Sequence, residues 1–179
     1  MQAIDPLLAE LIESLPTTPA IVTNEHFDVL ASNALARAVS PSLNAGVNLA
    51  EATFVNLSAH RTLADWDQVS TRMIELLHEA THASTRQSDP DPGRLSSLRA
   101  ELALHSAEFA KAWSAGTLPS SHALEVKMEH PDVGVLEITY ELMRLPDTRQ
   151  IVVMGHTVPG SESEQRLFRL AARADPFAT

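Results

Sequence analysis

The sequence predicts an α+β fold: an antiparallel sheet of about five strands, with a helical middle segment packed on one face. Two short apolar runs, 20–24 and 27–32, flank a polar turn near the start of the chain. Apolar residues then recur every three or four positions from about 65 to 115, which indicates helix. From Leu124 onward the apolar period becomes two, which is typical of strands with one face in water. We therefore expect strands from both ends of the chain to share one sheet.

The N-terminal elements carry clear start signals. Asp5 can cap a helix over 6–15, since its carboxylate can accept from the free N–H groups of the first turn. Pro6 suits the first position of this helix, because the N–H that proline lacks would have no partner within the helix there. The apolar face of this helix is Leu7, Leu8, Leu11, Ile12 and Leu15. Asn33 stands where a cap belongs, and predicts a short helix over Ala34–Val39.

Two long helices are predicted in the middle of the chain. Asp65 can cap the first, over about 65–82, and Asp91 with Pro92 starts the second, over about 93–115. Gly116 is a natural end for the second helix. The apolar stripes of the two helices are Trp66, Val69, Met73, Leu77 and Ala80, and then Leu95, Leu98, Leu102, Phe109 and Trp113.

The last third of the chain predicts a three-strand meander and a final helix. Leu124 to Met128 and Leu136 to Leu142 alternate apolar with polar residues around a turn at 130–134. A third strand follows over Ile151–Thr157. Ser161 with Glu164 forms a capping box for a helix over about 162–173.

Composition argues against several functional classes. Apolar residues make up 44% of the chain, yet no apolar run approaches the roughly 18–20 residues that a membrane span needs. The N-terminus lacks the features of a signal peptide, so we expect a cytoplasmic chain without a membrane partner. With no cysteine, disulfides and thiolate chemistry are excluded. Thirteen basic against 23 acidic residues leave a net charge of −10, so we do not expect this chain itself to bind DNA strongly.

One motif points to an enzyme. His78, Glu79 and His82 fit the H-E-x-x-H pattern of zinc hydrolases, with Glu101 or Glu108 as a conceivable third ligand. At about 100° per residue, however, His78 and His82 lie roughly 140° and 180° from the centre of the apolar stripe. We therefore predict that both histidines face solvent, and we expect neither catalysis nor a bound metal or cofactor.

A second group of residues is predicted to line a pocket, since large side chains gather on the stripes of two neighbouring helices. Plain core packing is the alternative for these residues, and the two interpretations are compatible because a pocket in such a domain is an underfilled core. The candidate ligand-binding residues are Phe54, Trp66, Val69, Met73, Leu102, His105, Ser106, Phe109, Trp113 and Tyr140.

Polar residues near the pocket have competing interpretations. Ser106 is expected to bond back to a helix carbonyl, and His105 to lie at the boundary of the core. If a carboxylate must be held, His105, Arg99 and Arg72 are the best-placed donors or cations, because an anion in apolar surroundings needs such a partner.

The order of these elements and several phrases resemble a known family. The opening strand, strand and helix are typical of sensor domains of PAS type. The phrases that carry the resemblance are Pro19-Ala20, Phe27 through Asn33, Gly46-x-Asn48-Leu49, Phe54, Asp65-Trp66, Ser106-x-Glu108-Phe109-Ala110-x-x-Trp113, His130-Pro131-x-Val133-Gly134-x-Leu136 and Leu145-Pro146. They run in order over about residues 16–172, and the chain resembles the ligand-binding domain of the MmyB-like transcription regulators. The family usually shows Leu-Arg where this chain has Leu77-His78.

The resemblance implies a function. It implies a PAS-like fold, a fatty acid or similar lipid-like ligand, and a helix-turn-helix DNA-binding domain, for which the residues before 16 are too few. On this basis the chain divides into a connecting helix, 1–18, a PAS-like ligand-binding domain, 19–160, and a C-terminal helix and tail, 161–179. Homodimerisation is expected, since regulators of palindromic sites are two-fold symmetric. The alternatives are the zinc hydrolase and a ligand-free PAS-like module for protein interaction or dimerisation.

Overall fold

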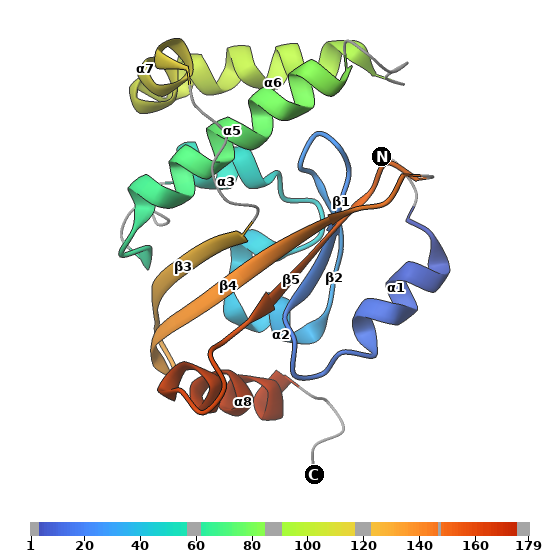
Figure 1. Cartoon of the computed structure of the whole chain (residues 1–179), viewed down its shortest axis with the longest axis vertical. Coiled ribbons are helices and arrows are strands. Elements are labelled where there is room, and N and C mark those ends of the chain that lie inside the picture. The colour runs from blue at the N-terminus through green and yellow to red at the C-terminus, as the bar shows by residue number, and fades with distance from the viewer. Residues whose placement is uncertain (1–3, 57–61, 85–90, 117–122, 147, 175–179) are drawn as a thin grey trace.

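The computed structural model describes residues 4–56, 62–84, 91–116, 123–146 and 148–174. At its centre is a five-stranded antiparallel sheet in the order β2-β1-β5-β4-β3 (Figure 1). The strands are β1 Ala20–Thr23, β2 Val29–Ser32, β3 Ala123–His130, β4 Gly134–Arg144 and β5 Ile151–His156. Strands from the two ends of the chain meet where β1 pairs with β5, so the predicted α+β fold with one shared antiparallel sheet is confirmed.

The helices form separate groups around this sheet. In Figure 1, α5, α6 and α7 make a layer beyond one end of the sheet, with α3 next to α5, and α8 lies at the opposite end. The helices are α1 Pro6–Glu13, α2 Ala34–Val39, the 3-10 turn η1 Pro41–Leu43, α3 Leu49–Phe54, α5 Trp66–Ser84, α6 Pro92–His105, α7 Ala107–Ala115 and α8 Glu162–Ala174. None of the helices among the described residues combines the length and apolar character needed to cross a bilayer.

The two faces of the sheet carry different cores. On one face, Ile151 and Val153 of β5 belong to the main core together with side chains of α2, α3, α5, α6, α7 and α8. On the other face, Val152 packs with Leu8 and Ile12 of α1. The helix α1, which lies outside the predicted middle segment, therefore covers this second face, because its apolar stripe needs a surface of its own to bury.

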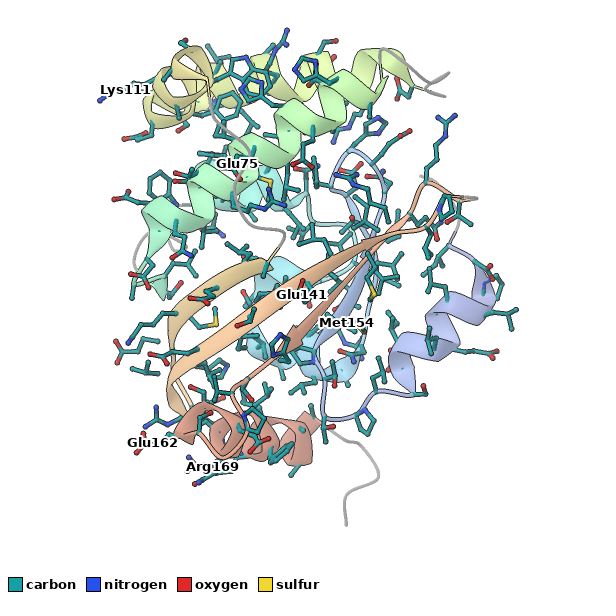
Figure 2. All side chains as sticks on the ribbon, in the orientation of Figure 1. Glu75, Lys111, Glu141, Met154, Glu162 and Arg169 are labelled. Carbon is teal, nitrogen blue, oxygen red and sulfur yellow. The ribbon has the colours of Figure 1, made fainter. Side chains whose placement is uncertain are left out.

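The rest of this second face, on β3 and β4, carries polar side chains. Glu125, Lys127 and Glu137 are exposed there, and Lys127 and Glu137 form a cross-strand ion pair of 2.6 Å. Glu141 and its cross-strand partner Met154 lie close together on the same face (Figure 2). The predicted alternation of the meander, with one face wet, is confirmed.

Asn33 joins several of the N-terminal elements. Its Oδ1 accepts hydrogen bonds from the N–H of Ala36, at 2.9 Å, and of Ala20, at 3.1 Å. The first bond caps α2, as predicted. Its Nδ2 donates to the carbonyls of Ile12, Leu15 and Thr18. One buried amide therefore fixes the end of α1, the start of β1 and the start of α2.

The predicted helix over 93–115 is two helices. Its backbone breaks at Ser106, which ends α6 and begins α7. The Oγ of Ser106 accepts a hydrogen bond from the N–H of Phe109 at 3.1 Å and donates to a carboxylate oxygen of Glu108 at 3.2 Å, so the prediction that this hydroxyl bonds back to a helix carbonyl is wrong. Gly116, at φ 70°, ends α7 as predicted.

The short helix α3 was not among the predicted elements. It starts at Asn48, whose Oδ1 accepts from the N–H groups of Ala50 and Glu51. The cap residue is readable in the sequence, but six residues give too little apolar periodicity to detect a helix.

Candidate functional site

Four aromatic side chains from three helices meet above the sheet. Phe54 of α3 contacts Trp66 of α5 and Phe109 of α7, edge to face, with ring centroids 6.1 Å and 5.0 Å away. Trp113 lies one turn beyond Phe109, with its ring 5.7 Å away. Phe109 is fully buried, whereas both tryptophans are partly exposed. We call these four residues the aromatic cluster; it joins α3, α5 and α7.

Most of the predicted site residues share one core. Phe54, Val69, Met73, Leu102, Phe109 and Tyr140 belong to it, and Trp66 and Trp113 pack against it. Tyr140 lies on β4, and burial raises the pKa of its hydroxyl well above the usual 10. Ser106 is buried at the joint between α6 and α7. His105 is exposed at the last residue of α6, outside this core.

His78 is only partly exposed, with its Nε2 atom buried, whereas helical phase predicted that it faces solvent. Its imidazole stacks on the indole of Trp113, with ring centroids 3.8 Å apart and planes 7° from parallel. His82, one turn later, is exposed as predicted. Helical phase failed at His78 because α7 covers a side of α5 that periodicity alone assigns to water.

The zinc-hydrolase pattern finds little support in this arrangement. Glu79, the general base of that pattern, pairs with Arg72 at 3.6 Å and with Arg144 of β4 at 3.3 Å. Across the described residues, no group of three or more His, Asp or Glu side chains is placed to hold a metal ion.

The three predicted cations occupy different environments. Arg72 is buried, and pairs with Glu75 at 3.0 Å as well as with Glu79, so its charge is already offset. Arg99 lies with its guanidinium carbon 5.4 Å from the centre of the Trp113 ring, and pairs with no carboxylate among the described residues. Arg99 therefore lies against the aromatic cluster without a carboxylate partner among the described residues, whereas Arg72 is already paired and His105 is exposed.

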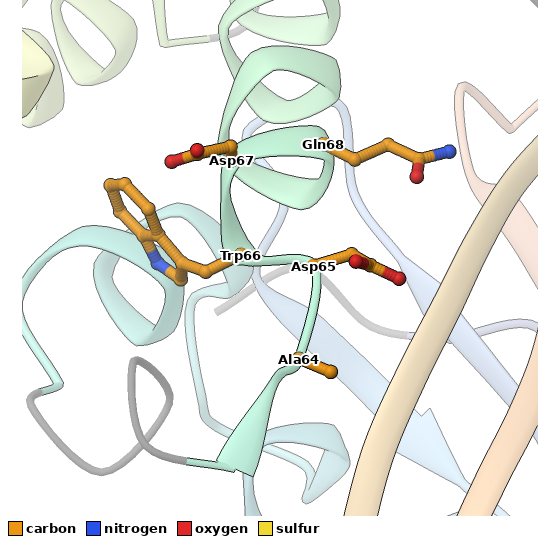
Figure 3. Close-up of a pocket in the computed structure, with 5 residues that line it drawn as sticks. All are labelled: Ala64, Asp65, Trp66, Asp67 and Gln68. Atoms are coloured by element: carbon orange, nitrogen blue, oxygen red, sulfur yellow. The ribbon is translucent and has the colours of Figure 1, made fainter.

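Two of the hollows in the described surface lie near the predicted site. The first, of about 310 Å³, is lined by residues 64–68 at the start of α5; Figure 3 shows Trp66 and Asp67 on one side and Asp65 and Gln68 on the other. The second, of about 400 Å³, is lined by residues of η1 and α3 and of the segment between them, among them Gly46, Glu51 and Val55. Neither is lined by Phe109 or Trp113, and neither contains a cation. The carboxylates in both make them poor sites for an anionic headgroup.

Comparison with known proteins agrees with this architecture. The family model of the MmyB-like transcription regulator ligand binding domain matches residues 4–171, which is nearly the whole chain. No curated protein matches the sequence significantly. The match spans the shared sheet, the helical layer with its aromatic cluster and nearly all of α8, so it covers every element described above. The chain belongs to the family of MmyB-like transcription regulator ligand binding domains.

Proposed function

We propose that this domain senses a fatty acid or a similar apolar small molecule, bound between the sheet and the helical layer. The aromatic cluster is the observation that carries this proposal. Its rings come from α3, α5 and α7, and they adjoin Met73, Leu102 and Tyr140 in one continuous core. A ligand inserted there would have apolar contacts on all sides, which is the composition of small-molecule sites in proteins.

Arg99 is the proposed partner of the ligand carboxylate. A carboxylate transferred from water to an apolar site needs a cation or hydrogen-bond donors. Arg99 already lies against Trp113, and no acidic side chain of the described residues neutralises it. Arg72 is less suitable, because Glu75 and Glu79 would repel a third carboxylate.

Ligand binding is proposed to shift a conformational equilibrium of the helical layer. The aromatic cluster is closely packed, so a ligand would be accommodated by displacing α7, which the break at Ser106 separates from α6. A ligand that binds the displaced arrangement better shifts the population toward it. In a cytoplasmic regulator, which we expect to be a homodimer, α1 would pass this change to a helix-turn-helix domain that binds DNA.

The first test is direct. Purified protein is extracted with organic solvent, the extract is analysed by mass spectrometry, and thermal unfolding is then followed with a chain-length series of saturated fatty acids. We expect a co-purified lipid, or a rise in melting temperature that depends on chain length, because a ligand that binds only the folded state stabilises it. Neither a lipid in the extract nor a thermal shift with any acid would contradict the proposal.

A variant tests the headgroup. Arg99→Gln should weaken binding of a fatty acid about tenfold, the size expected for losing one charge-assisted hydrogen bond, and should leave the affinity for its methyl ester unchanged. Arg169→Gln, on the exposed side of α8, is the matched control and should bind both ligands as the wild type does. Equal affinities of wild type and Arg99→Gln for the acid would exclude Arg99 as the partner.

A second candidate is the ligand-free module for protein interaction or dimerisation. The observation in its favour is that the rings of Phe109 and Trp113 pack against their neighbours, and that neither residue lines the two hollows described above. The extraction experiment separates the two candidates, since an interaction module would carry no lipid and would not respond to fatty acids.

A further inference from the structure

Three helices meet on one indole ring. Trp113 comes from α7, His78 stacks on it from α5, and Arg99 approaches it from α6. The stack of His78 on Trp113 is a contact between α5 and α7 that contains an ionisable ring. We infer that this stack is a pH-sensitive contact that holds α7 on α5 while His78 is neutral and weakens when His78 takes up a proton.

The Nε2 atom of His78 is buried and has no hydrogen-bond partner among the described residues. A neutral imidazole tolerates this position, because its proton can reside on Nδ1 and leave Nε2 without a hydrogen. The imidazolium form carries a proton on both nitrogens, so the second proton would create a buried donor without an acceptor. Such a group destabilises the arrangement that buries it.

The ionisable groups that act on His78 are His82, one turn along α5, and Arg99 of α6, while α7 presents the uncharged indole of Trp113. Neither group can attract an imidazolium. The face of the Trp113 indole attracts cations, but Arg99 already lies over that ring, and its guanidinium repels an imidazolium at every accessible pH. Burial, with His82 and Arg99 as smaller contributions, lowers the pKa of His78 below its usual 6.5.

The direction of the effect follows from linkage. A histidine whose pKa is lowered in the closed arrangement binds protons more readily once α7 is released. The closed arrangement is therefore fully stable above about pH 6.5, and loses stability as the pH falls from there toward the lowered pKa of His78. Acidification should release α7 from α5 before the rest of the domain responds.

This contact borders the aromatic cluster, because Trp113 stacks on Phe109. If the proposed ligand site lies in that cluster, the same protonation would alter access to it. That consequence rests on the proposed function, whereas the His78 contact itself does not, so its test uses the protein without fatty acid.

The test is hydrogen exchange of the α7 amides in the ligand-free chain between about pH 7.5 and pH 5.5, corrected for the intrinsic pH dependence of exchange. Protection of α7 in the wild type should fall about threefold or more over this range, whereas protection of the β4–β5 amides should remain constant. His78→Phe keeps an aromatic ring against Trp113 but cannot be protonated, and should abolish the pH dependence. His82→Gln is the matched control, since it leaves His78 in place and should retain most of the dependence.

Two results would overturn the inference. One is wild-type protection of α7 that does not change between the two pH values, and the other is the same fall in protection in His78→Phe. Should His78→Phe fail to fold, an NMR titration of the His78 ring in the wild type decides the matter, because an apparent pKa at or above 6.5 contradicts the inference. If the wild type bound no fatty acid at any pH, but its α7 protection still fell with pH as described, the result would contradict the proposed function and leave the His78 inference standing.

Discussion

At the residue scale, Gly155 shows how closely the centre of the sheet is packed. A Cβ atom added there would lie 2.8 Å from a methyl carbon of Ile138 and 2.9 Å from ring carbons of Pro19 and Tyr140. Gly155→Ala should therefore lower the free energy of unfolding by about 1–3 kcal/mol, the usual effect of overpacking, as measured by urea denaturation.

Gly93 provides the control at the same scale. A Cβ added to this residue of α6 meets nothing nearer than Asp91, at 3.9 Å. Gly93→Ala should leave the stability unchanged or raise it by up to about 1 kcal/mol, because alanine favours helix over glycine. If both variants lost the same stability, close packing at Gly155 would not be the cause.

At the element scale, the break between α6 and α7 determines how the helical layer is built. Ser106 caps α7 through the N–H of Phe109, which anchors the aromatic cluster. Ser106→Ala should lower the free energy of unfolding by about 1 kcal/mol, the usual effect of losing an N-cap, and should raise hydrogen exchange in α7 more than in α5.

Ser114→Ala is the matched variant for this prediction. Ser114 lies inside α7, is exposed and only donates to the carbonyl of Ala110, so its replacement should change the stability by less than about 0.5 kcal/mol. Equal effects of the two serine variants would mean that Ser106 has no special role as a cap.

The helical break also shows what periodicity cannot detect. Leu98, Leu102, Phe109 and Trp113 keep helical spacing across Ser106, so their pattern predicts one continuous helix. The sequence does contain one signal for a new helix start at this point. Ser106 is a typical N-cap residue, and Glu108 places an acidic side chain in the first turn that follows. Only the change in backbone direction brings Trp113 onto His78.

At the scale of the whole molecule, Asp28 connects three distant segments. Its carboxylate accepts from Asn24 at 3.0 Å, from Asn48 at 2.8 Å and from Arg94 of α6 at 3.2 Å. Burial acts to raise the pKa of Asp28, but the hydrogen bonds from Asn48 and Asn24 and the charge of Arg94 outweigh it, so the pKa lies below its usual 3.8.

The sign of this shift gives a prediction for acid stability. A carboxyl whose pKa is lowered by folding stabilises the domain above about pH 3.8 and ceases to do so as the pH falls through its folded pKa. Asp28→Asn should therefore flatten the decline of the urea midpoint between about pH 5 and pH 3. Arg94→Gln removes the cation but keeps both amide donors, and should give an intermediate slope. Identical slopes in all three proteins would contradict this role of Asp28.

Much of the packing of the candidate site could be predicted from the sequence, because the stripes of α5 and of the α6–α7 pair face a shared core. Trp66, Phe109 and Met73 were therefore found from spacing alone. His105 was selected for its position beside the stripe, yet it is exposed at the end of α6, because the chain changes direction at the next residue. The stacking of His78 on Trp113 had no local signal at all.

By itself the sequence determined the α+β class, the caps at Asn33 and Ser161, the alternation of the meander and the family, because caps and periodicity are set by neighbouring residues. Tertiary structure alone decided that α1 covers the second face of the sheet, that Arg94 reaches Asp28 and that His78 is stacked rather than solvated. These three features depend on contacts between residues far apart in the chain. Their energies come from burial and charge, which only the assembled fold defines.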